Sequence, residues 1–168
     1  MIDGKSHSVK PVCPGGRAEI VGTVGAERRT EETTMIRGSC LCGGVKFEID
    51  SAVSDMTDCH CSMCRKAHGA SFVTWVSSNR DDFRWVQGED LITRYASSAA
   101  FERLFCRVCG SNLPLYYAKL DELAVPAGIL DDDPGVRLEA HIFVGSKAPW
   151  VEISGDVECF DEYPPGDA

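Results

Sequence analysis

The amino-acid sequence predicts a mainly β domain. From residue 44 onward, short segments alternate apolar and polar residues, which is the two-residue period of a half-buried strand. Gly, Pro, Ser and Asp residues separate these segments, and such residues favour turns and loops. We therefore expect these segments to be short strands rather than long helices. The sequence shows no internal repeat of solenoid length.

The first expected strand is residues 44–50, where Val45, Phe47 and Ile49 alternate with Lys46 and Glu48. Further short strands are expected, in chain order, at residues 70–76, 91–96, 101–106, 122–128, 136–144 and 150–154. One helical turn is expected near residues 62–66. The stretch DDDPG at residues 131–135 predicts a turn.

Residues 1–34 carry no sustained periodicity and mix Gly, Pro, Thr and alternating charge, so we expect a mobile N-terminal extension. Its five basic and five acidic residues cancel, and the net charge of −9 therefore belongs to residues 35–168. A natural start of translation at Met35 fits this pattern and would make the extension an artefact of start-site choice. The predicted zinc-binding domain is then residues 35–168.

Composition narrows the class of protein. The 168 residues, 43% of them hydrophobic, suit one domain with its own core. No apolar run approaches the roughly 18 residues of a membrane span, and no basic segment followed by an apolar one opens the chain, so a cytoplasmic location is expected. The charge of −9 disfavours nucleic acid and anionic membrane as partners.

Nine cysteines in a chain expected to stay in the cytoplasm favour metal ligation over disulfides. Seven of them form three clusters: Cys40 with Cys42, Cys106 with Cys109, and the trio Cys59, Cys61 and Cys64. The trio lies on one short loop and can chelate one ion by itself. Each pair alone would leave a zinc half coordinated, so the two pairs are expected to share one structural zinc with four sulfur ligands.

The trio predicts a second zinc, of catalytic type, with three protein ligands and an open position. Three thiolates give this centre a formal charge of −1, which makes it a weak generator of hydroxide and a better partner for a soft incoming thiol. Arg65 and Lys66 follow the last ligand; they are expected either to offset the charge or grip an acidic substrate, or to be solvated surface residues. Buried free cysteines acting as small hydrophobic residues are the alternative to metal ligation.

Three histidines lie near this chemistry. His60 stands between two ligands, and in an extended segment its side chain points away from the metal, so a supporting role is expected. His68 could be a ligand, a proton shuttle or a plain surface histidine, and the last is the preferred interpretation. His141, inside an expected strand, is interpreted as a core or sheet-facing residue. Cys13 and Cys159 fall outside the clusters.

Four ordered motifs, GSCLCGGVKFE, CHCSMCRKAHGASF, FCRVCGSNL and VPAGILDD followed by HIFVGSKAPWVEI, resemble the glutathione-dependent formaldehyde-activating enzyme family, which includes centromere protein V. The resemblance runs from about Met35 to the C-terminal FDEYP. It implies a β-tent fold of small folded antiparallel sheets and the same two zinc sites. It also implies an S-(hydroxymethyl)glutathione synthase activity, a carbon–sulfur lyase type of reaction that joins formaldehyde to the thiol of glutathione.

Three functions therefore compete. The first is an enzyme in which Cys59, Cys61 and Cys64 bring a thiol, glutathione, to an aldehyde, with Arg65, Lys66 or Lys147 meeting its carboxylates. The second is a non-catalytic binding module braced by two zincs, because thiols add to formaldehyde readily without help. The third is zinc or redox sensing through the trio. The oligomeric state is left open by the sequence.

Overall fold

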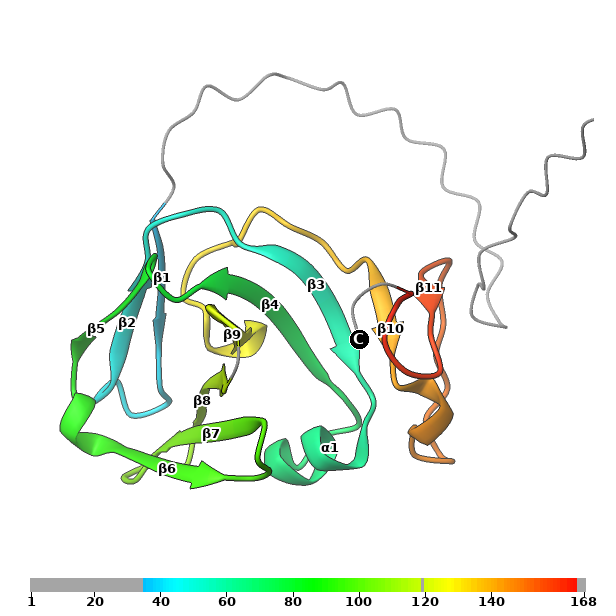
Figure 1. The fold of residues 1–168 in the computed structure, drawn as a ribbon, viewed down its shortest axis with the longest axis horizontal. Coiled ribbons are helices and arrows are strands. Elements are labelled where there is room, and N and C mark those ends of the chain that lie inside the picture. Colours follow the sequence, from blue (N-terminus) through cyan, green and yellow to red (C-terminus); the bar gives the residue numbers. More distant parts are fainter. Residues whose placement is uncertain (1–34, 119, 166–168) are drawn as a thin grey trace, which may run out of the picture.

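The computed structural model describes residues 35–118 and 120–165. They form a mainly β domain, which confirms the predicted fold class (Figure 1). The expected extension, residues 1–34 with Cys13, lies outside the described residues. The strands are β1 Ile36–Ser39, β2 Lys46–Ile49, β3 Ser54–Cys59, β4 Val73–Asn79, β5 Phe83–Gln87, β6 Ile92–Ala96, β7 Phe101–Cys106, β8 Asn112–Tyr117, β9 Glu122–Pro126, β10 Ala140–Ile142 and β11 Glu158–Cys159.

The described helices are short. The one α-helix is α1, Ser62–His68, and three 3-10 helices cover Glu89–Leu91, Ala127–Ile129 and Val144–Ser146. Within the described part of the chain, no helix has the length and apolar character needed to cross a membrane.

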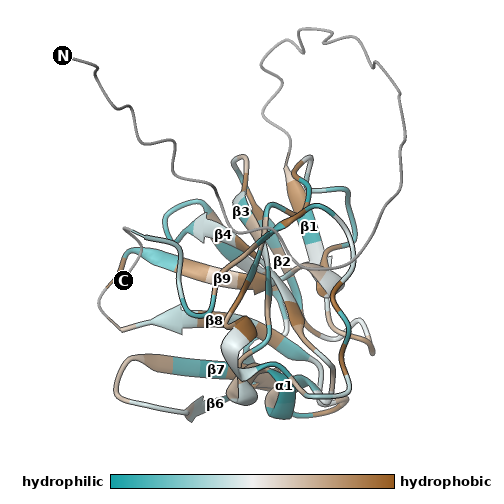
Figure 2. Ribbon diagram, turned by 90° about the vertical axis from the view of Figure 1, so that its right-hand side faces the viewer, coloured by the Kyte–Doolittle hydropathy of each residue, from teal (hydrophilic) through white to brown (hydrophobic). Residues whose placement is uncertain are grey.

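The strands make two sheets. The small sheet has the order β1-β2-β5, and the large one has the order β11-β10-β3-β4-β9-β8-β7-β6. Figure 2 shows β3, β4, β9, β8, β7 and β6 lying one after another across the large sheet. Neighbouring strands are antiparallel except at one edge, where β10 runs parallel to both β3 and β11. Figure 1 shows the small sheet beside the strongly curved β3 and β4.

The alternation of buried and exposed residues along β2 explains how the small sheet packs against the large one. In β2, Phe47 and Ile49 are buried while Lys46 is exposed, as the two-residue period predicts. These residues share a core cluster with Val76 of β4 and Val125 of β9. Two further clusters surround the cysteines: one contains Cys40 and Cys106, the other Cys59 and Cys64. Each cysteine group is therefore anchored in the packed interior by two buried members, while Cys42 is exposed and Cys61 and Cys109 are partly exposed.

The structure corrects several expected elements. Residues 101–106 form β7 as predicted, but residues 150–154 form no strand, because the Val151 amide donates to Ala148 O in a local turn and Trp150 is exposed. The strand expected at 136–144 shrinks to β10. Strands β1, β3, β5, β8 and β11 were not expected from the sequence, and α1 extends two residues beyond the predicted turn.

Gly88 makes a close backbone contact that a side chain would break. It lies at φ +73°, and a Cβ added there would approach Gly44 O to 2.1 Å. Gly88→Ala combines this clash with left-handed strain, so we expect it to lower the free energy of unfolding by about 2–5 kcal/mol. Denaturant unfolding of the metal-loaded protein measures this loss.

Gly135→Ala is the matched control for this substitution. Gly135 has a similar φ of +78°, but a Cβ there would meet nothing within 4 Å. The control should lose only about 1 kcal/mol, from strain alone. Equal losses for the two variants would show that the contact between Gly88 and Gly44 is unimportant.

Candidate metal centres and active site

Two tight turns bring four cysteines together. Cys40 and Cys42 lie on the turn after β1, where the Gly43 amide donates to Cys40 O over 2.8 Å. Cys106 ends β7, and the Gly110 amide donates to Cys106 O, also over 2.8 Å. Both glycines have positive φ, +69° and +75°, which explains why each turn carries a glycine after its cysteines.

The four thiols have the spacing of a single metal site. The Sγ atoms of Cys40 and Cys42 are 3.4 Å apart, those of Cys42 and Cys106 are 3.9 Å apart, and the set including Cys109 lies within 4.8 Å. Tetrahedral zinc with sulfur at about 2.3 Å needs sulfur–sulfur distances of about 3.8 Å. The Val45 amide also donates to Cys40 Sγ over 3.2 Å. The group could therefore hold one soft metal ion.

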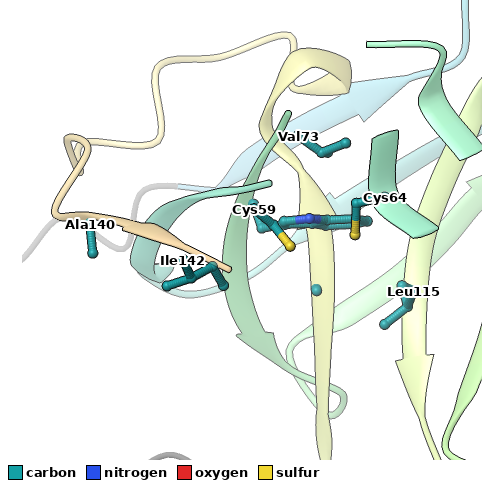
Figure 3. Close-up of a cluster of buried hydrophobic side chains, with 8 residues drawn as sticks. Cys59, Cys64, Val73, Leu115, Ala140 and Ile142 are labelled. Carbon is teal, nitrogen blue, oxygen red and sulfur yellow. The ribbon is translucent and has the colours of Figure 1, made fainter. Parts of the chain in front are cut away.

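The second cysteine group lies where β3 meets α1. Cys59 is the last residue of β3 and is paired with Val73 of β4 and Ile142 of β10, so strands flank it on both sides. Cys61 caps α1, its Sγ accepting from the Cys64 amide over 3.3 Å. The three Sγ atoms lie within 4.8 Å of one another. Figure 3 shows Cys59 and Cys64 among the buried side chains of their core cluster.

Burial and hydrogen bonding distinguish the three thiols. Cys59 and Cys64 are buried, whereas Cys61 is partly exposed. Hydrogen bonds from the thiols of Cys59 and Cys64 lower the pKa of Cys61. Cys61 is therefore the thiol of the trio that solvent and small molecules can reach, and the group could hold a second soft cation with one face toward solvent.

Comparison with known proteins agrees with this geometry. A family model described as glutathione-dependent formaldehyde-activating enzyme matches residues 35–146, which include both cysteine groups. The chain belongs to this family.

Its relatives are similar over most of their length. A putative glutathione-dependent formaldehyde-activating enzyme of Halomonas elongata is 31% identical over 140 residues, which cover 77% of this chain and 89% of the relative. An uncharacterized lyase of Schizosaccharomyces pombe is 29% identical over 124 residues, which cover 73% and 88%. A crystal structure of a Rhodobacter sphaeroides protein is 30% identical, with a TM-score of 0.49, and covers 60% of this chain and 90% of its own.

In this member of the formaldehyde-activating enzyme family, Arg65 and Lys147 donate to backbone oxygens rather than to the sulfurs of the trio. The Arg65 guanidinium donates to two backbone carbonyls, to His60 O over 3.1 Å and to Ser146 O over 3.3 Å. Lys147 Nζ donates to Val151 O over 3.0 Å, and Lys66 is exposed. Arg65 therefore ties the cysteine loop to the segment after β10, and its charge is directed at backbone oxygen.

Arg103 of β7 is the cation that sequence reasoning missed. Its side chain is buried, and one guanidinium nitrogen lies 3.9 Å from Cys64 Sγ, although the two residues are 39 positions apart. A local pattern cannot show this contact. The alternation of β7 gave a weak signal, because it places Arg103 on the same face of the strand as Phe101 and Phe105.

The structure shows the surroundings of the three histidines near the trio. His60 is fully buried, and its Nε2 lies 3.1 Å from Nδ1 of His141, which is also buried, as expected for a core residue. The interpretation of His68 as a plain surface residue is wrong, because its ring packs edge-on against Trp75 at 5.4 Å. Burial and the charge of Arg103 lower the pKa of His68 to about 4.

Aromatic side chains border the same region. Phe101 and Tyr117 pack edge-to-face at 5.3 Å, and both contact the core cluster that contains Cys59 and Cys64. Burial, the nearby Tyr163 and the charges of these two thiols raise the pKa of Tyr117 to about 12. The sulfur atoms therefore lie against a largely apolar wall that limits the access of water.

Proposed function

We propose that the protein catalyses the addition of a thiol to an aldehyde, as a carbon–sulfur lyase-type enzyme resembling S-(hydroxymethyl)glutathione synthase. The thiol is glutathione, and the aldehyde is formaldehyde or a similar small aldehyde. The convergence of three thiols, with Cys61 reachable from solvent, carries this proposal. Membership of a family named for glutathione-dependent formaldehyde activation supports the choice of substrates.

Two zinc ions per chain are part of the proposal. Cys40, Cys42, Cys106 and Cys109 would hold a structural ion, and Cys59, Cys61 and Cys64 one of catalytic type. Thiol-only donor sets whose sulfur atoms lie within 4.8 Å of one another support both sites, and sulfur spacings of 3.4 and 3.9 Å support the first. A zinc ion held by three thiolates supplies an open coordination position at which a substrate thiol is kept as thiolate.

The reaction needs few other groups from the protein. A carbon–sulfur bond forms, the carbonyl double bond opens, and the proton lost from sulfur ends on oxygen. The protein's own contribution is to fix the reacting sulfur in position and to exclude water from one side. The anchoring of Cys59 between two strands serves the first task, and the aromatic pair Phe101 and Tyr117 serves the second. A cytoplasmic location, where glutathione is reduced, fits this function.

Exchange between free formaldehyde and its glutathione adduct tests this function. Protein carrying two zincs per chain should raise the exchange rate in proportion to its concentration, as measured by magnetization-transfer NMR. The same concentration of zinc salt with glutathione, without protein, is the control. An exchange rate that the loaded protein leaves unchanged would reject the enzymatic proposal.

A further inference from the structure

Arg103 carries a buried charge that no carboxylate in the described part of the chain balances. Its relative exposure is 9%, and within residues 35–118 and 120–165 no Asp or Glu lies within ion-pair distance of its guanidinium. Its hydrogen-bond contact is Cys64 Sγ at 3.9 Å. An unpaired charge in a protein interior is costly, so the negative charge that Arg103 faces must come from the thiolates of the trio and from what binds there.

The strand holds this guanidinium in place. Arg103 is paired with Tyr95 of β6 on one side and with Leu115 of β8 on the other. The register of β7 against β8 shifts between Arg103 and Phe105, and such irregularities commonly re-aim a side chain beside a site. The two pairings fix the backbone of Arg103, and the burial of its side chain keeps the guanidinium close to Cys64.

The other cations nearby are engaged elsewhere. Arg65 and Lys147 donate to backbone carbonyls, and Lys66 is exposed. Among the described residues, Arg103 is the cation that donates a hydrogen bond to a sulfur of the trio. Among these cations, Arg103 is therefore the one whose charge a hydrogen bond directs at a sulfur of the trio.

We propose that Arg103 determines the charge of the ligand that the trio accepts, favouring an anionic thiolate over a neutral ligand. This inference rests on the proposed metal site. A divalent ion with three thiolates carries −1, and Arg103 brings the local total to zero. An incoming thiolate then produces −1 rather than −2 in a half-buried site, where the difference in charge is weakly screened.

A second role for Arg103, binding a carboxylate of glutathione, predicts something different. A carboxylate contact would affect glutathione but not a small thiol without carboxylates. If Arg103 instead balances the charge at the sulfur atoms, its loss would lower the binding affinity for both thiols equally and leave the affinity for neutral ligands unchanged. The choice of probe ligand therefore separates the two roles.

The test uses the full chain loaded with Co²⁺, whose absorption spectrum reports its ligands without any turnover. 2-Mercaptoethanol, glutathione and imidazole are titrated into the wild-type protein, Arg103→Gln, Arg103→Lys and the control Arg94→Gln. Arg94 lies on the neighbouring β6, is half exposed and pairs with Glu102. A Cys61→Ser variant identifies the part of the spectrum that belongs to the trio. Metal content and circular dichroism establish that each variant is folded.

We expect Arg103→Gln to lower the binding affinity for both thiols by about tenfold or more, and the affinity for imidazole by less than about twofold. Arg103→Lys should restore most of the thiol affinity, and Arg94→Gln should match the wild type. Equal thiol affinity in Arg103→Gln and wild type, or a loss confined to glutathione, would overturn the inference. A wild-type spectrum that no thiol changes would instead reject the proposed function itself.

Discussion

Replacing Cys106 with serine is expected to leave the chain unable to fold. Cys106 is fully buried at the end of β7 and lies in the core cluster with Cys40. Structural zinc contributes about 10–16 kcal/mol in small zinc-binding domains, while a whole domain is stable by only about 5–15 kcal/mol. Losing one of four ligands from such a site therefore removes most or all of the net stability. Circular dichroism and zinc content of the purified variant measure the effect.

The described structure gives a second reason for this expectation. The turns at Cys40 and Cys106 bring β1 of the small sheet next to β7 of the large sheet, where the cysteine group, its core cluster and a hydrogen bond from the Leu41 amide to Ser111 Oγ over 2.9 Å connect them. Cys109→Ser should reduce the stability less than Cys106→Ser, because Cys109 is partly exposed. A Cys106→Ser chain that unfolds cooperatively near the wild-type temperature would contradict the structural assignment.

Replacing Cys61 with serine is expected to abolish activity and leave the fold intact. Cys61 is partly exposed, and its Sγ caps α1 by accepting from the Cys64 amide. Serine is a good cap residue, so the helix should keep its start while the trio loses one thiolate. We expect one zinc per chain instead of two, a midpoint of thermal unfolding within a few degrees of wild type, and a formaldehyde–glutathione exchange rate at the uncatalysed level.

This variant also separates an enzyme from a binding module. If both metal ions only braced the scaffold, Cys61→Ser would reduce stability or change nothing, and the exchange rate would equal that of wild type. Met63→Ser is the matched control, because Met63 is an exposed residue of α1 that contributes no thiol. A folded Cys61→Ser protein that keeps the wild-type exchange rate would disprove the role of the trio.

Strands with clear alternation could be predicted from the sequence, and those with polar or mixed composition could not. The pattern at residues 101–106 is confirmed as β7, in which Leu104 and Cys106 are buried on one side. Strand β3, with the sequence SDMTDC, has no apolar period; it forms because β4 and β10 flank it on both sides. The opposite error occurs at residues 150–154, where alternation is present but the backbone bonds of Val151 are used in a turn.

The grouping of the cysteines could be predicted because chelation is a local matter of spacing. The structure brings the same four and three thiols together, while their assignment as zinc ligands stays a prediction. The charges around the trio could not be predicted, because they depend on contacts between distant segments. Arg65, close in sequence, faces carbonyl oxygen, whereas Arg103, on another strand, faces Cys64. The environment of His68 depends likewise on Trp75 of β4.

The parallel pairing of β3 with β10 has a consequence for the order in which the protein matures during synthesis. Cys40, Cys42, Cys106 and Cys109 are all synthesised before residues 140–142, whereas the loop of Cys59 waits for Ile142 to complete its flanking strand. Translation proceeds at about 5–20 residues per second, so the interval lasts seconds. The four-cysteine group therefore has all of its residues before the trio has both of its flanking strands, because β10 lies in the last third of the chain.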